Sequence, residues 1–374
     1  MTGISVVIPV RNGAACLGDT LESVWAQKVD AALEILVVDD MSTDGSGELA
    51  EAVAGARPLR VLRGEGRGAA AAVNLGIREA SHAIICQVDQ DVVLHAGWLA
   101  HVVKALEAPG VAAAQGHYVT DPGARLLPRV MSLDLEMRYA SVPTETDHVC
   151  TGNAAYRADA LACVGLFDEA LGYGYDNDMS YRLRAAGYRL VFCRDARSVH
   201  RWREGLVGYV RQQYGFGYGR LDLVAKHPRR VGGDRVSPTL MMLHPLALLV
   251  ALTAVLVAPA LRGNGALFAR AFALVVLGGL TIERALVGLR ATLRFKDAAA
   301  LWFPVVHLAR DLAWIVAIVV WMLRRVSGTA TDPGHSMRSR EGGLPLVGAS
   351  GAWSIASTPV VSDAARDRTE SLQH

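Results

Sequence analysis

The 374-residue sequence lacks a strong net charge, because 38 Lys and Arg residues balance 36 Asp and Glu residues to give +2 at neutral pH. No global field therefore points to nucleic acid as a partner. Cysteines are few and scattered, with no CxxC pair and no His/Cys metal spacing; they are Cys16, Cys86, Cys150, Cys163 and Cys193. This usage predicts reduced thiols in a cytosolic domain.

The N-terminus lacks the features of a signal peptide. Its apolar run, residues 4–10, is short, has no basic residue before it and ends in Pro-Val-Arg-Asn. A secretory leader carries a basic segment before a longer apolar one. We expect this run to be a strand.

Charge is also missing from residues 236–261, a run longer than the roughly 20 residues that span a bilayer. A second apolar run, 267–282, contains Arg270, and a third, 301–323, is interrupted by Arg310-Asp311. Charges inside a span are costly unless paired, so the third run is a candidate for an interfacial helix. The hydrophobic content of 52% agrees with a membrane segment.

The first 115 residues alternate between strand and helix patterns. The predicted strands are 4–10, 34–38, 59–63 and 83–88, and the predicted helices are 15–27, 46–53, 68–80 and 98–106. This order predicts right-handed βαβ units on a parallel sheet. Such sheets bind ligands at the carboxyl ends of their strands, where polar clusters follow in this sequence.

Asp89 and Asp91 flank Gln90 directly after an apolar strand. Alternate residues of a strand point the same way, so the two carboxylates can converge on one Mg²⁺ or Mn²⁺ ion. A bound metal neutralises a diphosphate leaving group. A solvated acidic turn is the alternative.

Other polar clusters point to a nucleotide. Asp39-Asp40 end a strand, where acids accept hydrogen bonds from a base or a ribose, although a turn or capping role is the alternative. Arg11-Asn12 leave the first strand, and the glycines around Arg67 let backbone approach a phosphate.

Two further clusters follow. Asp176 and Asp178 precede a predicted helix at 179–186, so one can be a general base and the other a cap. After another strand, His200 is a candidate third metal ligand, Arg201 a candidate diphosphate ligand and Trp202 a surface for a sugar ring.

Together these motifs resemble the inverting family 2 glycosyltransferases of the GT-A fold. The motifs occur in the family's order over roughly the first 205 positions: VVIPVRN at 6–12, EILVVDDMSTDG at 34–45, DQD at 89–91, GN at 152–153, GLFDE at 165–169 and DNDMSYRL at 176–183. Tyr175 stands where the family has the first acid of a Glu-Asp pair, and the Gln-x-x-Arg-Trp motif of processive synthases is absent.

The resemblance implies an α/β, GT-A-like nucleotide-binding domain with a mostly parallel central sheet, followed by C-terminal transmembrane helices. It implies that Asp91 is the main metal ligand, with Asp89 facing the ribose or diphosphate, and that Asp176 is the usual base, although Asp178 stays an alternative. The implied donor-site residues are Pro9, Val10, Arg11, Asn12, Asp39, Asp40, Arg67, Asp89, Gly152, Asn153, Arg201 and Trp202.

We therefore expect four regions: a catalytic domain at 1–205, a basic and aromatic interfacial helix at 206–235, two to three transmembrane helices at 236–326 and a disordered tail at 327–374. Cations before the first span predict a cytosolic catalytic domain on the inner membrane.

The expected reaction is metal-dependent transfer of a single sugar, with inversion, from a nucleoside-diphosphate sugar to a hydroxyl of a lipid-linked or cell-envelope acceptor. The alternatives are a nucleotidyltransferase, which would release pyrophosphate, and a membrane transporter or scaffold with a nucleotide-sensing domain.

Overall fold

A computed structural model of the chain describes residues 3–202 and 204–328. The described residues form one nine-stranded mixed sheet in the order β3-β2-β1-β4-β8-β6-β9-β5, with β7 paired to β9. The strands are β1 (Ile4–Val10), β2 (Leu33–Asp39), β3 (Arg60–Arg63), β4 (Ile84–Val88), β5 (Val92–Leu94), β6 (Val111–Tyr118), β7 (Glu145–Thr146), β8 (Asn153–Arg157) and β9 (Arg189–His200). The β3-β2-β1-β4 half is parallel, as its alternation with helices predicts.

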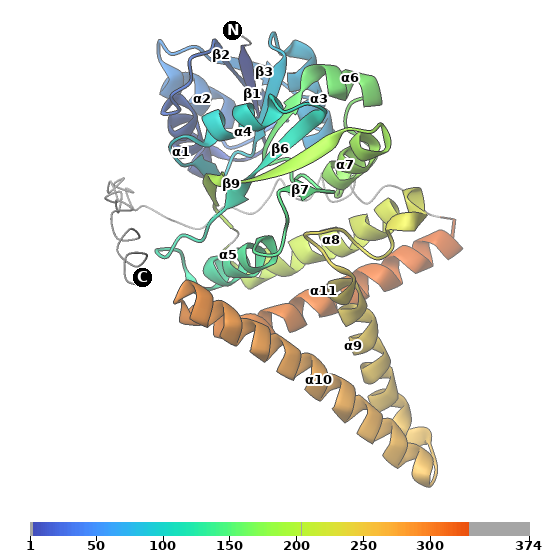
Figure 1. Cartoon of the computed structure of the whole chain (residues 1–374). Helices are drawn as coiled ribbons and strands as arrows, with labels where there is room; N and C mark the ends of the chain where they lie inside the picture. Colours follow the sequence, from blue (N-terminus) through green and yellow to red (C-terminus); the bar gives the residue numbers. More distant parts are fainter. Residues whose placement is uncertain (1–2, 203, 329–374) are drawn as a thin grey trace, which may run out of the picture. The chain divides into compact units, whose positions relative to one another are not determined.

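Helices cover both faces of the sheet (Figure 1). One face packs on α1 (Ala14–Trp25), α2 (Ser46–Ala54) and α4 (Trp98–Leu106). The other packs on α3 (Ala69–Glu79), α6 (Ala158–Val164) and α7 (Tyr175–Ala185). Burial on both faces explains why β1 is a nearly continuous apolar run, in which only Pro9 is not fully buried.

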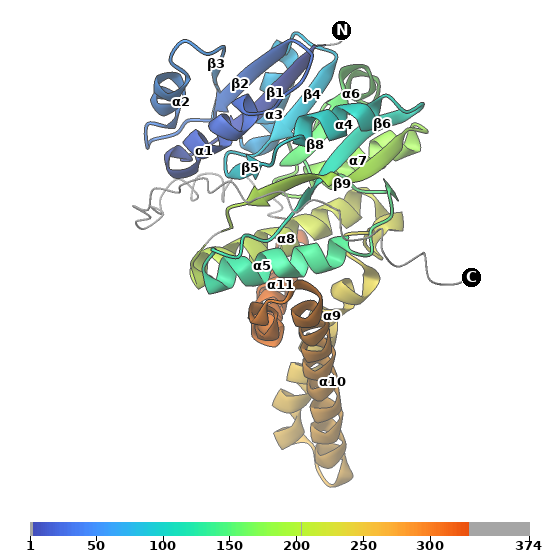
Figure 2. The ribbon, with the colours of Figure 1, turned by 60° about the vertical axis from the view of Figure 1, so that its left-hand side comes forward.

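A second core joins α5 (Leu126–Tyr139) and α8 (Leu206–Lys226) to the C-terminal helices. Val130 and Leu133 of α5 pack with Tyr209 of α8 and with Phe303. Figure 2 shows α5 and α8 next to each other, with α11 (Phe303–Val326) beneath them.

Three described helical segments are long and apolar enough to cross a membrane: Thr239–Ala260, Asn264–Phe295 and Ala298–Val326. They contain α9 (Thr239–Val257), α10 (Asn264–Phe295) and α11. Along α9 and α10 most large aliphatic side chains, such as Leu256 and Leu274, are exposed. Lipid is the surrounding in which such a surface is stable.

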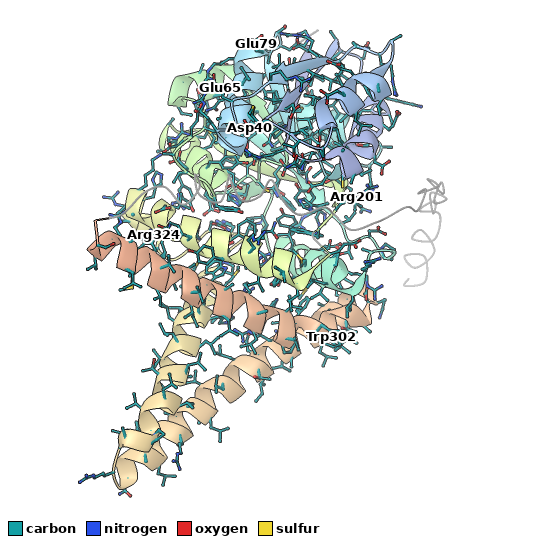
Figure 3. All side chains as sticks on the ribbon, turned by 180° about the vertical axis from the view of Figure 1, so that it is seen from behind. Asp40, Glu65, Glu79, Arg201, Trp302 and Arg324 are labelled. Atoms are coloured by element: carbon teal, nitrogen blue, oxygen red, sulfur yellow. The ribbon has the colours of Figure 1, made fainter. Side chains whose placement is uncertain are left out.

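The third segment is different, because α11 is nearly half-buried and runs along α8 between the positions of Trp302 and Arg324 (Figure 3). Its Asp311 is fully buried and pairs with Arg310, at 3.1 Å, and with Arg284 of α10. The charges that interrupt this run are therefore paired inside the protein, which removes much of their cost in an apolar setting.

The predicted fold class is confirmed. One boundary differs in a way that matters: the helix expected at 179–186 begins at Tyr175, after Gly174 in the left-handed region at φ 82°. Asp176 and Asp178 therefore both lie in the first turn of α7 rather than before it. The expected tail lies almost entirely outside the described residues.

Candidate active site

The parallel strands bring three polar segments to one edge of the sheet. Val10 pairs with Asp39 across β1 and β2, and Val7 pairs with Gln87 across β1 and β4. Arg11, Asp40 and Asp89 each follow the end of one of these strands, so they meet at this edge.

A cluster of three possible metal ligands lies here. One ligand atom from each of Asp89, Asp91 and His200 lies within 4.8 Å of the other two. His200 ends β9 and pairs in register with Val92 of β5, which places its Nε2 3.6 Å from Asp91 Oδ1. Two carboxylates and an imidazole suit a divalent cation such as Mn²⁺, so the residues fit the predicted metal.

The two adjacent carboxylates of this cluster favour a bound cation. Burial, together with the charge of Asp91, raises the pKa of Asp89 to about 7, although Gln87 donates a 2.8 Å hydrogen bond to its carboxylate. Like charges held close together disfavour ionisation, and a bound cation reverses that preference. Gly152 permits the close packing, because a Cβ there would lie 2.1 Å from Asp89 Oδ2.

Gln90 was not among the predicted site residues, yet it ties the acidic turn to β1. Its Oε1 accepts a 2.8 Å hydrogen bond from the Arg11 amide, and its own carbonyl accepts one from Thr20 Oγ1. A Cβ at Gly13 would clash with it at 2.3 Å. The middle position of an acidic triplet carries no signal of such a role in the sequence.

Asp40 organises the loop after β3. It is almost fully buried, and its two carboxylate oxygens accept 2.8 Å hydrogen bonds from the amides of Gly66 and Gly68. Arg11 lies 3.6 Å away, and a carboxylate oxygen can accept a second hydrogen bond. Asp40 therefore shapes this loop, and its carboxylate oxygens can each accept a further hydrogen bond.

Asp39 and Asn12 have local partners. Asp39 accepts hydrogen bonds from the Ser42 amide, at 2.9 Å, and from Arg63, at 2.7 Å. Asn12, at φ 51°, accepts one from the Thr43 amide at 2.8 Å. Both therefore hold the turn that carries Asp40. Pro9 and Val10 lie at the end of β1 beside this turn, with Val10 buried.

Other predicted donor-site residues already have protein partners. Arg67 pairs with Glu65 at 2.9 Å and with Glu169 at 2.6 Å. Asn153 is fully buried and accepts a 2.5 Å hydrogen bond from Trp98 Nε1, so its carboxamide belongs to the core. These contacts orient both side chains, and their predicted part in donor binding stays a prediction.

Arg201 and Trp202 lie beside the acidic cluster. The Arg201 amide donates a 2.9 Å hydrogen bond to the Asp91 carbonyl, and its guanidinium pairs with Asp19. The ring of Trp202 lies 4.2 Å from that of His200, so it supports the candidate ligand.

The two candidate bases, Asp176 and Asp178, differ in burial and in their charged partners. Asp178 is fully buried and contacts Arg182 at 2.8 Å, Lys226 at 2.6 Å and His227 at 2.8 Å. Burial raises its pKa, but these three partners outweigh burial and lower it. The N-cap residue of α7 is Gly174, so Asp178 lies inside the helix and is not its N-cap. It joins α7 to the end of α8 instead.

Asp176 is only partly buried and pairs with no Lys or Arg among the residues described. Its Oδ1 accepts a 2.9 Å hydrogen bond from the Asn177 amide, and its Oδ2 lies 3.5 Å from His148 Nε2. Its charge reaches Asp89, where it adds a small further rise to the pKa after burial and Asp91. Of the two acids, Asp176 has the free capacity that a base requires.

Comparison with known proteins finds glycosyltransferases. The profile described as "Glycosyl transferase family 2" matches residues 5–165. The pre-mycofactocin glycosyltransferase of Mycobacterium tuberculosis is 30% identical over 340 residues, covering 86% of this chain and 67% of that protein. The undecaprenyl-phosphate mannosyltransferase of Micrococcus luteus is 30% identical over 209 residues, covering 50% of this chain and 80% of that protein.

A solved structure supports the same fold. The mannosyltransferase of Pyrobaculum calidifontis, in complex with GDP-Man and Mn²⁺, superposes with a TM-score of 0.55 at 22% identity. The superposition covers 86% of this chain and 87% of that one.

Proposed function

The chain belongs to glycosyl transferase family 2, and we propose that it transfers a single sugar, with inversion, from a nucleoside-diphosphate sugar to a hydroxyl acceptor at a membrane. The observation that carries the proposal is the cluster of Asp89, Asp91 and His200 at the carboxyl edge of the sheet, together with Asp176, whose charge acts on Asp89 and which pairs with no Lys or Arg among the described residues. Family membership favours this reaction over nucleotidyl transfer and over transport.

We assign the divalent metal, Mg²⁺ or Mn²⁺, to Asp89, Asp91 and His200. When bound, it stabilises negative charge on a diphosphate leaving group. The Mn²⁺ in the Pyrobaculum mannosyltransferase complex supports the assignment. Asp40, Arg11 and the loop through Gly66 and Gly68 bind the nucleoside, for which their positions at the strand ends are suited.

In the proposed mechanism Asp176 accepts the proton of the acceptor hydroxyl. The hydroxyl oxygen attacks the anomeric carbon as the bond from that carbon to the diphosphate oxygen breaks, and the nucleoside diphosphate leaves with the electron pair. Attack opposite the leaving group inverts the configuration. No protein nucleophile takes part, so Asp178 can remain in its ion pairs.

The acceptor is a lipid-linked or cell-envelope hydroxyl compound. Support for a lipid-linked acceptor comes from the three helices that can cross a membrane and from the relative whose name specifies a lipid phosphate, the undecaprenyl-phosphate mannosyltransferase; the hydroxyl is our proposal. The sugar and the base are tested with a panel of GDP-mannose, UDP-glucose and UDP-N-acetylglucosamine. Metal-dependent release of nucleoside diphosphate supports glycosyl transfer, whereas release of pyrophosphate contradicts it.

The proposed location is the inner membrane, with the catalytic domain in the cytosol and α9 and α10 as a spanning hairpin. Cations at 226–235, before the first span, support this orientation. Cys163 is exposed on the catalytic domain and serves as a native reporter. An impermeant maleimide should label it only after the cells are permeabilised.

The matched reporter is Arg262→Cys in the connection between α9 and α10, where the side chain is exposed. It should react in intact cells once the other thiols are replaced. Labelling of Cys163 in intact cells would reverse the proposed topology.

A further inference from the structure

A histidine outside the predicted site lies directly behind the proposed base. His148 belongs to the loop between β7 and β8, and its Nε2 lies 3.5 Å from Asp176 Oδ2. Its side chain is about nine-tenths buried. Neither ring nitrogen makes a standard hydrogen bond among the described residues, so the contact with Asp176 is the principal polar interaction of the ring.

A second carboxylate lies near the same imidazole. Asp234 has a side chain that is 1% exposed, and its charge acts on His148. Its Oδ2 accepts a 3.0 Å hydrogen bond from Asn177, the neighbour of Asp176, and lies 3.3 Å from Arg220 of α8. His148 therefore lies in the field of two carboxylates and one guanidinium.

Asp234 also shapes the segment that leads into α9. Its Oδ1 accepts hydrogen bonds from the amides of Val236, at 3.0 Å, and Ser237, at 2.7 Å. The turn before the first apolar helix is thus joined through Asp234 to α7, which carries Asp176. This joins the membrane-proximal segment to the proposed reaction centre.

The groups around His148 act on its pKa in opposite directions. Burial lowers the pKa of His148, but the contact with the Asp176 carboxylate and the charges of Asp234 and Asp176 outweigh burial and Arg220, so the pKa is raised. The carboxylate of Asp147, the preceding residue, pairs with Arg230 and accepts a hydrogen bond from the Arg235 amide. A cation against a carboxylate favours the ionised carboxylate, which is the form that accepts a proton.

We propose that His148 is a positioning residue for the catalytic base: its imidazole directs the Asp176 carboxylate, and Asp234, on the segment that leads into α9, supports this contact through its charge and through Asn177. This inference rests on the proposed function, in which Asp176 takes the acceptor proton. It assigns to the linker before α9 a part in catalysis besides anchoring.

The test compares His148→Gln with His101→Gln in the full-length chain purified in detergent. His101 is exposed on α4, so the same substitution there should leave turnover unchanged. With the donor chosen from the panel, His148→Gln should lower kcat about 10- to 100-fold, as loss of a supporting partner does at other reactive groups. KM for the donor should stay within about twofold.

The pH profile separates positioning from a structural role. Without the cation, protons compete with catalysis at higher pH, so the acidic limb of the kcat profile should move upward in His148→Gln. Asp234→Asn leaves His148 in place and should also move the acidic limb of the kcat profile upward. This second variant tests the proposed role of His148 even if His148→Gln fails to fold. Added imidazole should partly restore turnover in His148→Ala.

Three outcomes would overturn the inference: unchanged kcat in His148→Gln, a loss that follows the melting temperature with an unmoved pH profile, or an unmoved profile in Asp234→Asn. Asp176→Asn distinguishes the failures. If that variant stays active, the proposed base is wrong. If it is inactive while His148→Gln is normal, the mechanism stands and only the role of His148 falls.

Discussion

Two acidic groups flank the proposed reaction centre, and they differ in how their charges are balanced. Asp89 and Asp91 lie together without a Lys or Arg partner in the part of the chain that the structure describes, and His200 is their nearest basic group. Asp178, in contrast, is enclosed by Arg182 and Lys226 and also by His227.

The difference shows which acids are available for a ligand. A carboxylate surrounded by cations has its charge and lone pairs already used, so its contribution is to stability. Two adjacent carboxylates without a cation are destabilised by their own repulsion and gain most from a metal. Asp176 is between these extremes, since His148 is the one basic side chain that contacts it in the described part of the chain.

Replacement of the proposed base should have the largest effect. Asp176→Asn keeps the size of the side chain but cannot take a proton, so transfer should fall by about 10²–10⁴-fold. Donor binding and the melting temperature should change little, because Asp176 pairs with no Lys or Arg within residues 3–202 and 204–328. Steady-state kinetics with donor titration measure both, and retained transfer would place the base elsewhere.

The second-largest effect is expected from a change in the pair Asp89 and Asp91. Asp91→Asn should lower turnover by about 10²–10³-fold, as loss of one stabilising group at a developing charge does. Mn²⁺-dependent nucleotide binding should weaken, while the apo protein should be as stable as wild type because a like-charge repulsion is removed. Calorimetric titration with Mn²⁺ and nucleotide provides the check. Wild-type activity in excess EDTA would contradict the metal assignment.

A change in Asp178, which is paired with Arg182, Lys226 and His227, should lower stability rather than turnover. Asp178→Asn leaves Arg182 and Lys226 without their buried counter-ion and should cost about 3 kcal/mol, the low end for a buried pair because Lys226 is partly hydrated. This exceeds the roughly 1 kcal/mol that a lost cap would cost. Turnover per folded molecule should stay within a few-fold of wild type.

The same variant has a pH signature. Because the pKa of Asp178 is lowered on folding, its stabilisation is present above the unfolded value of about 3.9 and is lost as pH falls through the folded value. Wild type should therefore lose its advantage over Asp178→Asn below about pH 4. Melting curves from pH 7 to pH 3 would show it, and a constant difference would contradict the ion-pair account.

The smallest effect is expected at an exposed acid. Asp159 pairs with Arg157 at 2.5 Å, but its side chain is 65% exposed. Water screens such a pair, so Asp159→Asn should cost less than about 1 kcal/mol and leave turnover unchanged. It is the control for Asp178→Asn, since the chemical change is the same and only burial differs. Equal losses in melting temperature would remove the distinction between the two sites.

The sequence predicted the N-terminal half of the sheet well, because alternating strands and helices are local patterns. The strands that end at Val10 and Val88 end where expected, the strand predicted to end at residue 38 ends one residue later at Asp39, and polar residues follow each of them. The start of α7 was placed four residues late, because Gly174 begins that helix from a left-handed conformation without a capping side chain. No composition rule marks such a start.

The part of the candidate site that was predicted from the sequence is the part whose residues form local motifs. The acidic triplet and His200 are visible as motifs, and the structure brings their ligand atoms within 4.8 Å. Asn153 and Arg67 also belong to motif-rich segments, but their side chains bond to Trp98 and Glu169. Gln90 and His148 were missed because their partners are 79 and 28 residues away in the chain.

What the sequence alone determined is the family, the fold class and the apolar segments, since ordered motifs and hydrophobic periodicity are local. Tertiary structure decided the charge environment of each acid. Asp176 and Asp178 are two residues apart, yet successive positions of a helix point to different neighbours, so one faces His148 and the other Arg182 and Lys226. Which of them can react depends on those distant partners.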